Sequence, residues 1–272
     1  MTINCRGNLI DLTSTKVMGI LNITPDSFFD GAKFSTNDLI LTQVQKMLTD
    51  GADFIDIGAA SSKPNASFVV ETDEISRILP VVDLILKNFP NTIISIDTFR
   101  SEVARLCLAN GASIINDISA GSLDLKMMQV VANANAPYIM MHMRGTPKTM
   151  QNLTDYDDIV KEIIFYFSEK IAQATSFGIK DLIVDPGFGF AKTTNQNFDV
   201  LKNLELFQVL DLPILAGISR KSMIYKTLDT TAENALNGTS VLNTIALTKG
   251  AKILRVHDVK EAVECIKLVS KI

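Results

Sequence analysis

The sequence lacks the features expected of secreted and membrane proteins. It has only three cysteines in 272 residues, at positions 5, 107 and 265, and this wide spacing suggests neither a disulfide framework nor a metal site. It has no apolar run of the length of about 18 residues that a membrane span needs. Residues 1–16, "MTINCRGNLIDLTSTK", are polar and charged where a signal peptide is apolar. We therefore expect a cytoplasmic protein with buried, reduced thiols.

Positive charge is also scarce, and it is not concentrated in any block. The chain has 26 Lys and Arg against 30 Asp and Glu, with a net charge of −4 and a pI of about 5.3. Nucleic acid is therefore not expected as a partner. A Walker phosphate loop, a linker and a low-complexity tract are likewise missing. These absences predict one domain over residues 1–272, a length that α/β barrels reach as a single unit.

What the sequence does contain is a regular alternation of short β-branched apolar runs and longer helical patterns. It predicts eight strands, at 17–23, 54–58, 93–98, 114–119, 138–142, 182–187, 214–219 and 253–257. It predicts eight helices, at about 37–50, 72–89, 101–110, 124–135, 156–177, 195–210, 222–249 and 259–271. Continuously apolar strands indicate a parallel sheet covered by helices. The count predicts an α/β fold, a single-domain (β/α)8 TIM barrel, with a doubly wound open sheet as the alternative.

Nearly every predicted strand ends in a polar residue. We call this set the polar ring: Asn22, Asp56, Asp97, Asn116, His142, Asp185, Ser219, Arg255 and His257. In a barrel the C-terminal ends of the strands meet at one mouth, where such enzymes keep their active sites. A single strand-end Asp is more often a helix cap, but a set this complete predicts an active site.

Part of the polar ring suits a planar heterocycle. Asp97, Asn116 and Asp185 offer carboxylate and amide groups that fit the hydrogen-bonding edge of an amino-pyrimidine. Lys221 follows the seventh strand and is placed to reach a ring carbonyl. Its alternative role is a solvated helix N-terminus, where a cation opposes the helix dipole.

A second part of the polar ring suits a phosphate or pyrophosphate. Strands one and eight are neighbours in a closed barrel, so Asn22, Arg255 and His257 should lie close together. A lone His257 would more often be an interior histidine, and the presence of Arg255 favours the anion site. The role of His142 stays open.

The segment "DPGFGFAKT" (185–193) follows the sixth strand and contains two glycines. We expect these to let the chain turn tightly against a bound ring. Phe188 and Phe190 then either wall the pocket or form a pair in the core.

The segment "VMGILNITPDSFFDGAKF" (17–34) begins as a buried strand and then becomes polar and aromatic. Pro25 bars regular pairing and Gly31 indicates a turn. The second half is therefore predicted to be a mobile loop with a function at the mouth of the barrel.

Seven blocks in this order resemble dihydropteroate synthase over nearly the whole chain. They are "MGILNITPDSFFDG", "FIDIGAASSKPNA", "SIDTFRSEVARLCLANGASIINDIS", "MHMRGTPKTM", "DPGFGFAKT", "GISRKS" and "RVHDV". The resemblance implies a TIM-barrel transferase of folate biosynthesis, dimeric and dependent on Mg²⁺, of the family that sulfonamides target. Its reaction condenses 6-hydroxymethyl-7,8-dihydropterin diphosphate with p-aminobenzoate and releases pyrophosphate.

The resemblance also implies roles for individual residues. The pterin would be held by Asp97, Asn116, Asp185, Lys221 and Arg255, the last stacking on its face. The diphosphate would be held by Asn22, Arg255, His257 and Ser62, with Asn22 also at the metal. The p-aminobenzoate pocket would contain Phe28, Ser61, Ser62, Lys63, Pro64, Phe190 and Ser222. The residues implied in catalysis are Asp97, Lys221, Asp26 and Phe28.

The loop "SSKPNA" departs from the common form of the family, "ESTRPGA". Ala60 replaces Glu, Ser62 replaces Thr, Lys63 replaces Arg and Asn65 replaces Gly. Lysine keeps the positive charge but loses the bidentate fork of arginine. The change bears on affinity for p-aminobenzoate and for sulfonamides.

Two other readings compete with the synthase. A pterin-binding barrel of the methyltetrahydrofolate methyltransferase type would share the pterin contacts but needs no diphosphate site. A catalytically inactive scaffold would have lost the polar ring. The segments "SFFDGAKF", "GISRKS" and "RVHDV" favour the synthase. For its chemistry we hypothesise a dissociative, SN1-like step, in which the electron-rich dihydropterin stabilises a cation next to Asp97.

Overall fold

Eight parallel strands form one sheet that closes on itself. The computed structural model describes residues 1–23, 36–59 and 69–272. The strands are β3 (Lys16–Asn22), β4 (Phe54–Gly58), β5 (Ile93–Asp97), β6 (Ile114–Asp117), β7 (Tyr138–Met141), β8 (Leu182–Asp185), β9 (Leu215–Ala216) and β10 (Ile253–Val256). Their order is β8-β7-β6-β5-β4-β3-β10-β9, and a parallel bridge between Val184 and Ile214 joins the two ends. The predicted TIM barrel is confirmed.

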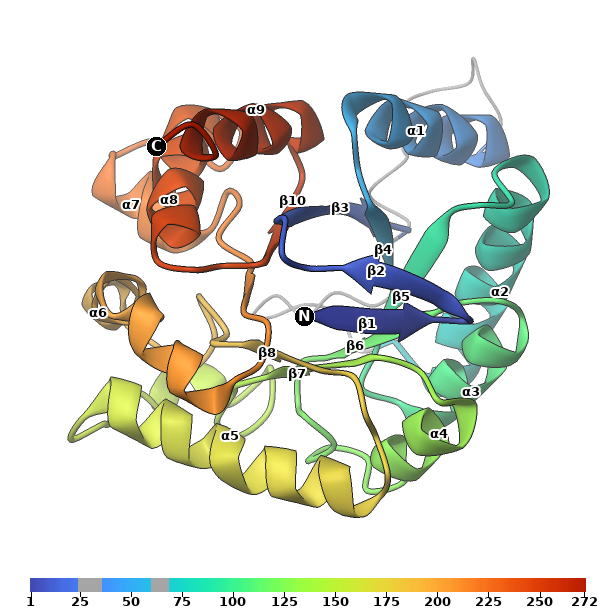
Figure 1. Ribbon diagram of the computed structural model, residues 1–272, viewed down its shortest axis with the longest axis horizontal. Coiled ribbons are helices and arrows are strands. Elements are labelled where there is room, and N and C mark those ends of the chain that lie inside the picture. Colours follow the sequence, from blue (N-terminus) through green and yellow to red (C-terminus); the bar gives the residue numbers. More distant parts are fainter. Residues whose placement is uncertain (24–35, 60–68) are drawn as a thin grey trace.

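Helices surround the barrel (Figure 1). They are α1 (Thr36–Asp50), α2 (Glu71–Asn88), α3 (Ser101–Ala109), α4 (Met127–Ala134), α5 (Ile159–Ser176), α6 (Thr194–Lys202), α7 (Ser222–Thr227), α8 (Leu236–Thr248) and α9 (Val259–Val269). Short 3-10 helices are present at Met150–Asn152 and Leu204–Leu210.

Two helix predictions were wrong in extent. The expected helix 222–249 is two helices, α7 and α8, separated by residues 228–235. That connection, "LDTTAENA", is rich in Asp, Thr and Asn, whose side chains compete with helical hydrogen bonds, and Asp229 has a φ of 47°. The expected helix 195–210 leaves α-geometry at Asn203, whose side chain donates to the carbonyl of Asp199.

An antiparallel hairpin, which the sequence patterns did not predict, covers the N-terminal end of the barrel. It consists of β1 (Thr2–Cys5) and β2 (Asn8–Asp11), and it lies across the near end in Figure 1. Ile3, Cys5 and Leu12 pack against the inward residues at the base of the strands, such as Phe54. The turn is Arg6-Gly7, both with positive φ, and it lacks the Asn-Gly or Asp-Gly signature by which such turns are recognised.

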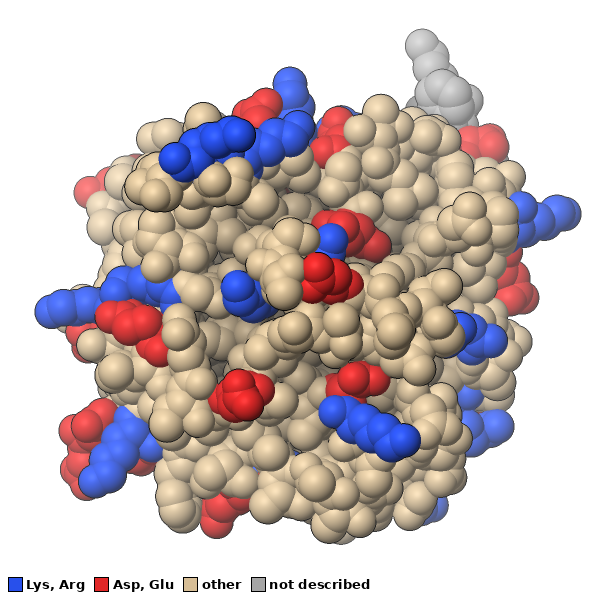
Figure 2. Space-filling model, viewed as in Figure 1, with Lys and Arg blue, Asp and Glu red and all other residues tan. Residues whose placement is uncertain are grey.

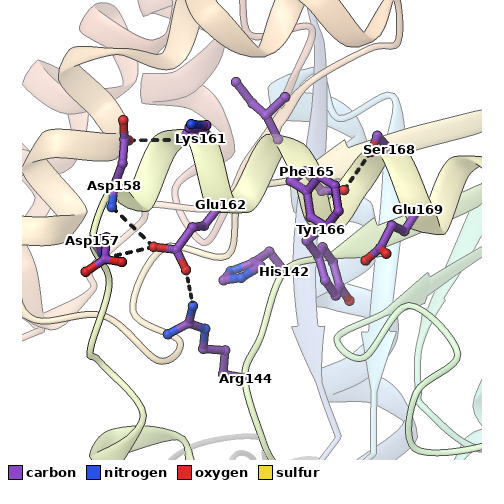
Figure 3. Close-up of a pocket in the computed structure, with 11 residues that line it drawn as sticks. His142, Arg144, Asp157, Asp158, Lys161, Glu162, Phe165, Tyr166, Ser168 and Glu169 are labelled. Carbon is purple, nitrogen blue, oxygen red and sulfur yellow. Dashed lines mark hydrogen bonds and ion pairs between the residues drawn. The ribbon is translucent and has the colours of Figure 1, made fainter.

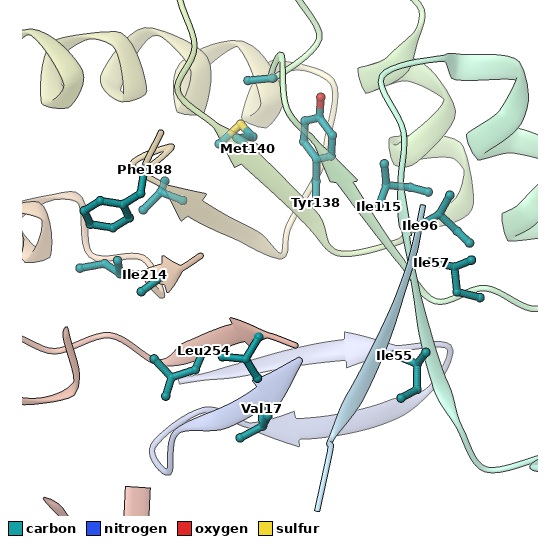
Figure 4. Packing of buried hydrophobic residues seen from close by; sticks show 14 of the residues in the cluster. Val17, Ile55, Ile57, Ile96, Ile115, Tyr138, Met140, Phe188, Ile214 and Leu254 are labelled. Atoms are coloured by element: carbon teal, nitrogen blue, oxygen red, sulfur yellow. The ribbon is translucent and has the colours of Figure 1, made fainter. Parts of the chain in front are cut away.

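The main core lies between the strands and the helices. The outward-facing strand residues Val17, Ile55, Ile57, Ile96, Ile115, Tyr138, Met140 and Leu254 belong to it (Figure 4). Successive side chains of a strand point to opposite faces, so every second residue points into the barrel. On β10 the inward series is Ile253, then Arg255, then His257: apolar at the base and charged at the mouth.

Positive and negative side chains are interspersed on the face of the molecule that carries the hairpin (Figure 2). On the face that carries the hairpin, Lys and Arg lie beside Asp and Glu without forming a continuous basic stripe (Figure 2). Among the described residues, none of the helices has the length and apolar character to cross a membrane.

Candidate functional site

Arg255 joins four strands of the barrel through one hydrogen-bonded cluster. Its Nε donates to Asp56 Oδ2 at 2.6 Å, and its Nη2 donates to Asp97 Oδ2 at 2.6 Å. Asn116 Nδ2 donates to the same Asp56 oxygen at 3.0 Å. The cluster therefore brings β4, β5, β6 and β10 together at the predicted mouth.

Burial makes this cluster electrostatically sensitive. It raises the pKa of Asp97 to about 7, although the Arg255 guanidinium acts to lower it and Asp56 adds to the rise. Burial alone would lower the pKa of Arg255, but the Asp56 and Asp97 carboxylates outweigh it and raise that pKa. The cluster therefore holds a permanent cation beside a carboxyl group that titrates near neutral pH.

Asp56 was placed in the polar ring from the sequence but received no role there. Its side chain is fully buried, and among the described residues its Oδ1 has no hydrogen-bond partner, whereas Oδ2 accepts two bonds. It lies two residues before the end of its strand, on the inward side. Strand alternation was the available signal, because it places Asp56 on the same face as Asp97 and Arg255.

Across the mouth, Asp185 and Lys221 face the same open position. A Cβ built on Gly217 would lie 3.7 Å from Asp185 Oδ2 and 3.9 Å from Lys221 Nζ, so the glycine leaves space between the two charged groups. Burial raises the pKa of Asp185 and lowers that of Lys221 to about 8, and each group opposes the shift of the other. Lys221 Nζ also donates to the carbonyl of Phe188. A donor and an acceptor thus face one space, as the edge of a planar heterocycle requires.

The predicted anion residues lie at the rim. The strands β3 and β10 pair in parallel, as expected for the first and last barrel strands. Asn22 and His257 are exposed, and Ser219 Oγ lies 3.1 Å from His257 Nδ1. A Cβ built on Gly58 would meet both Asn22 Oδ1 and Asp97 Oδ2, at 3.6 and 3.7 Å, so these two side chains are neighbours.

His142 does not belong with the other polar-ring side chains at the mouth, which corrects its place in that series. It follows Met141, which points inward, and its own side chain points outward to α5, where it packs edge-on against Tyr166 at 4.9 Å. It borders a cavity of about 710 Å³ beside α5 (Figure 3). Within that cavity Arg144 pairs with Glu162, and no other member of the polar ring lines it. The cavity is therefore separate from the candidate site.

In the Gly-rich segment the structure separates the two phenylalanines, for which the sequence left the pocket and the core both open. Phe188 is fully buried in the main core (Figure 4) and does not wall the pocket, whereas the ring centroid of Phe190 lies 4.9 Å from Lys221 Nζ. Gly187 has a φ of 73°, and a Cβ there would lie 2.1 Å from the carbonyl oxygen of His142. The glycine thus allows a close approach of this turn to the backbone at the end of β7.

Several predicted residues lie outside the described part of the chain. They are Asp26, Phe28, Ser61, Ser62, Lys63 and Pro64, together with the altered positions Ala60 and Asn65. Ser222, which is partly buried, begins α7 directly after Lys221. Over residues 1–23, 36–59 and 69–272, no group of three or more His, Cys, Asp and Glu side chains could hold a metal ion.

Comparisons with known proteins agree with one another. A family model described as "Pterin binding enzyme" matches residues 18–257. The dihydropteroate synthase of Escherichia coli K12 is 41% identical over 271 residues, covering 99% of this chain and 95% of that protein. The Yersinia pestis dihydropteroate synthase in complex with a sulfonamide drug matches with a TM-score of 0.93 and 38% identity, over 100% of this chain and 98% of that one. The Xanthomonas albilineans enzyme with 4-aminobenzoic acid matches with a TM-score of 0.92 and 34% identity, covering 99% and 97%.

Proposed function

Because this chain belongs to the dihydropteroate synthases, pterin-binding transferases of folate biosynthesis, we propose how its own residues perform that reaction. The comparisons support the synthase over a methyltetrahydrofolate methyltransferase, since the Escherichia coli and Yersinia pestis relatives, which match nearly the whole chain, are dihydropteroate synthases. The observation that carries the proposal is the arrangement at the mouth, with Arg255 between two carboxylates and the Asp185–Lys221 pair facing Gly217. Incubating the protein with the dihydropterin diphosphate, p-aminobenzoate and Mg²⁺ should yield dihydropteroate and pyrophosphate.

The pterin occupies the space in front of Gly217. Asp185 accepts from the amino-pyrimidine edge, and Lys221 donates to the ring carbonyl. Asn116 turns its amide nitrogen to Asp56 and therefore offers its oxygen to the ligand. Asp56 and Asp97 hold two edges of the Arg255 guanidinium, which leaves its face to stack on the pterin.

Asp185→Asn is expected to weaken dihydropterin binding about tenfold or more, because an amide donor would face a ligand donor in a buried site. The fold should remain intact, since Asn still accepts from the amide of Gly187. Calorimetry with 6-hydroxymethyl-7,8-dihydropterin measures the effect. Unchanged affinity would remove Asp185 from the pterin pocket.

The diphosphate binds at the rim, on Asn22, Arg255 and His257; Ser62, which belongs to the same proposal, lies outside the described residues. Mg²⁺ typically binds through one or two protein oxygens and the phosphates of its substrate, and the exposed Asn22 amide oxygen fits that role. When bound, the ion neutralises the charge that develops on the departing pyrophosphate. The chain itself orients the diphosphate through the Arg255 and His257 nitrogens.

His257→Ala should weaken binding of the diphosphate substrate but leave the affinity for a dihydropterin without phosphates within about twofold. The difference arises because His257 is exposed at the rim, whereas the proposed pterin contacts Asp185 and Lys221 face Gly217. Parallel titrations with the two ligands test it. An equal loss for both ligands would contradict the anion assignment.

The p-aminobenzoate pocket is proposed to include Phe190 and Ser222, on either side of Lys221. The other residues proposed for it, Phe28, Ser61, Ser62, Lys63 and Pro64, lie outside the described residues. We also propose a cytoplasmic location, since Cys5, Cys107 and Cys265 are buried and unpaired, as expected in a reducing compartment.

A homodimer is proposed as the working form. Val241 and Ile245 lie one turn apart on α8, with 51% and 36% of their surface exposed, and Leu228 after α7 is 54% exposed. Such a group of exposed apolar side chains is typical of a contact surface. Val241→Glu should therefore shift the protein to a monomer in sedimentation velocity, with Leu9→Glu on the hairpin as a matched control that leaves the dimer intact. A monomeric wild-type protein, or a dimer unaffected by the change, would exclude this surface.

The chemical step is proposed to be dissociative. The C–O bond to the pyrophosphate breaks first, and the positive charge spreads over the dihydropterin ring. The aniline nitrogen then forms the C–N bond to the CH₂ carbon and loses one proton to solvent or to the released pyrophosphate. Asp97 lies beside this ring and its carboxylate form stabilises the cation, which is electrostatic stabilisation at the point where charge develops. Arg255 favours the ionised form of Asp97, since its guanidinium acts to lower the Asp97 pKa, which burial raises to about 7.

A further inference from the structure

Lys192 is a buried lysine that the reaction, as described so far, does not use. Only 5% of its surface is exposed. Its Nζ lies 3.0 Å from each of three acceptors, namely His142 Nδ1, the carbonyl oxygen of Gly187 and the carbonyl oxygen of Phe190. Burial lowers the pKa of Lys192 to about 7, and the Asp185 carboxylate acts to raise it. In its ammonium form the group has three hydrogens to donate, and this environment accepts all of them. The group is therefore held in place and cannot also bind a substrate.

The three acceptors belong to two different strand ends. His142 follows β7, while Gly187 and Phe190 belong to the turn after β8. The histidine ring is neutral, because burial holds the pKa of His142 well below its ordinary value, and the neutral ring can accept at Nδ1. Lys192 thus ties the turn 187–190 to the neighbouring strand from the outer side of the barrel.

The turn 187–190 has an irregular backbone, and the hydrogen bonds from Lys192 stabilise it. Gly187, Gly189 and Ala191 all have positive φ, at 73°, 82° and 48°. The carbonyl groups of Gly187 and Phe190 point to one spot, and the Lys192 ammonium occupies it. Without the cation the two carbonyl dipoles would repel each other, and two buried acceptors would lose a strong partner.

The same turn holds the two charged groups at the open position. The amide of Gly187 donates to Asp185 Oδ1 at 2.8 Å, and the carbonyl of Phe188 accepts from Lys221 Nζ. The Phe190 ring lies against that same Nζ. Any shift of the turn therefore moves Asp185 and Lys221 relative to each other.

We propose that Lys192 is a positioning residue of the pterin pocket, which acts by fixing the turn 187–190 on which Asp185 and Lys221 depend. The inference rests on the proposed pterin site in front of Gly217. It assigns Lys192 no contact with either substrate. It predicts that losing the ammonium changes pterin binding more than p-aminobenzoate use.

The first test compares Lys192→Met with Lys202→Met, an exposed lysine at the end of α6. Lys192→Met keeps most of the stem and removes the donors. It should weaken 6-hydroxymethyl-7,8-dihydropterin binding about tenfold, as expected when a set of charge-assisted hydrogen bonds is lost. The KM for p-aminobenzoate should rise by clearly less, because Phe190 of that pocket lies on the turn held by Lys192 but Ser222 does not. Lys202→Met should change neither. Equal losses for both substrates would show a general structural role and overturn the proposal.

A double-mutant cycle with Lys221→Met decides whether Lys192 acts through the pocket. If Lys192 works by placing Lys221, the double variant should bind the dihydropterin only slightly more weakly than Lys221→Met alone. If the affinity of the double variant for the dihydropterin falls by the product of the two single losses, the two lysines act independently. That result would overturn the proposal. Hydrogen exchange of residues 186–191 should also become faster in Lys192→Met, while exchange in α1 and α9 stays unchanged.

Asp185→Asn serves as the reference for the pterin site itself. If it weakens dihydropterin binding and Lys192→Met does not, the proposal fails and the site stands. If neither variant changes the affinity, both are wrong. Should Lys192→Met fail to fold, Lys192→Gln keeps an amide donor and enters the same measurements, with an expected loss smaller than that of the Lys221→Met variant.

Discussion

Replacing Arg255 by alanine is expected to weaken both the folded state and substrate binding. The substitution leaves Asp56 and Asp97 buried without their common partner, and breaking a buried ion pair in this way lowers stability by about 3–5 kcal/mol. It also removes the cation proposed for the diphosphate and the face proposed for the pterin. Binding of the pterin diphosphate should fall by about a hundredfold, the equivalent of losing a strong charged hydrogen-bond pair.

Urea denaturation and calorimetry measure the two effects. Arg105→Ala is the matched control, since Arg105 also makes two bonds to a carboxylate, that of Glu102, but on the exposed surface of α3. It should leave both quantities unchanged. Arg255→Lys keeps the positive charge but loses the bidentate fork of arginine. Its stability and its affinity for the pterin diphosphate should therefore lie between those of Arg255→Ala and those of the wild type. Normal stability of Arg255→Ala would show that the two carboxylates do not depend on Arg255.

Arg255→Ala should also alter the pH dependence of activity. Arg255 acts to lower the pKa of Asp97, which is about 7 in the folded protein. Without Arg255 that pKa rises further, so the carboxylate form appears only at higher pH. The acid limb of the kcat/KM profile should therefore move to higher pH, and an unmoved limb would show that Asp97 does not control it.

Asp97→Asn is expected to slow the chemical step by about a hundredfold to a thousandfold, the range for removing one group that stabilises transition-state charge. An amide retains the hydrogen-bonding shape but not the negative charge. Affinity for the ground-state dihydropterin should therefore fall much less, by about tenfold at most. Single-turnover rates and calorimetry separate the two quantities, and equal losses would make Asp97 a binding group only.

Isotope effects at the CH₂ group test the dissociative step directly. A cationic transition state predicts a clear secondary deuterium effect, because the reacting carbon becomes planar. A large primary carbon effect with almost no secondary deuterium effect would indicate direct displacement. In that case the proposed role of Asp97 in stabilising a free cation would be wrong.

Asp97 should also influence stability as a function of pH. Its folded pKa of about 7 lies above the ordinary value of 3.8, because burial penalises the charged form. The folded protein therefore holds this proton more tightly than the unfolded chain does. The resulting stabilisation is complete below about pH 4 and is lost as the pH rises through about 7. The stability of Asp97→Asn relative to the wild type should accordingly improve between pH 4 and pH 8.

The sequence alone determined the eight barrel strands and most residues of the mouth. Strand periodicity is a local property, since neighbouring side chains must point to opposite faces. A parallel barrel then brings every inward strand end to one place, which is why Asn22, Asp97, Asn116, Asp185 and Arg255 could be grouped before any coordinates were known. The family resemblance assigned them to substrates but did not show how they contact one another.

The tertiary structure alone decided the features that depend on contacts between distant segments. The hairpin at residues 2–11 has weak local signals and is held by the base of the barrel, through side chains such as Leu12. His142 was misplaced because strand ends do not keep a regular alternation, so its packing against α5 sets its direction. For Phe188 the sequence left a pocket wall and the core both open, and the tertiary packing places it in the core. The roles of Asp56 and Lys192 could not be read from the sequence pattern. Asp56 contacts Arg255, and Lys192 contacts His142, in both cases a residue far away in the sequence. The closure of the barrel decides which polar groups meet in the buried network. Only closure brings Arg255 to Asp56 and Asp97, which lie 199 and 158 positions earlier in the chain.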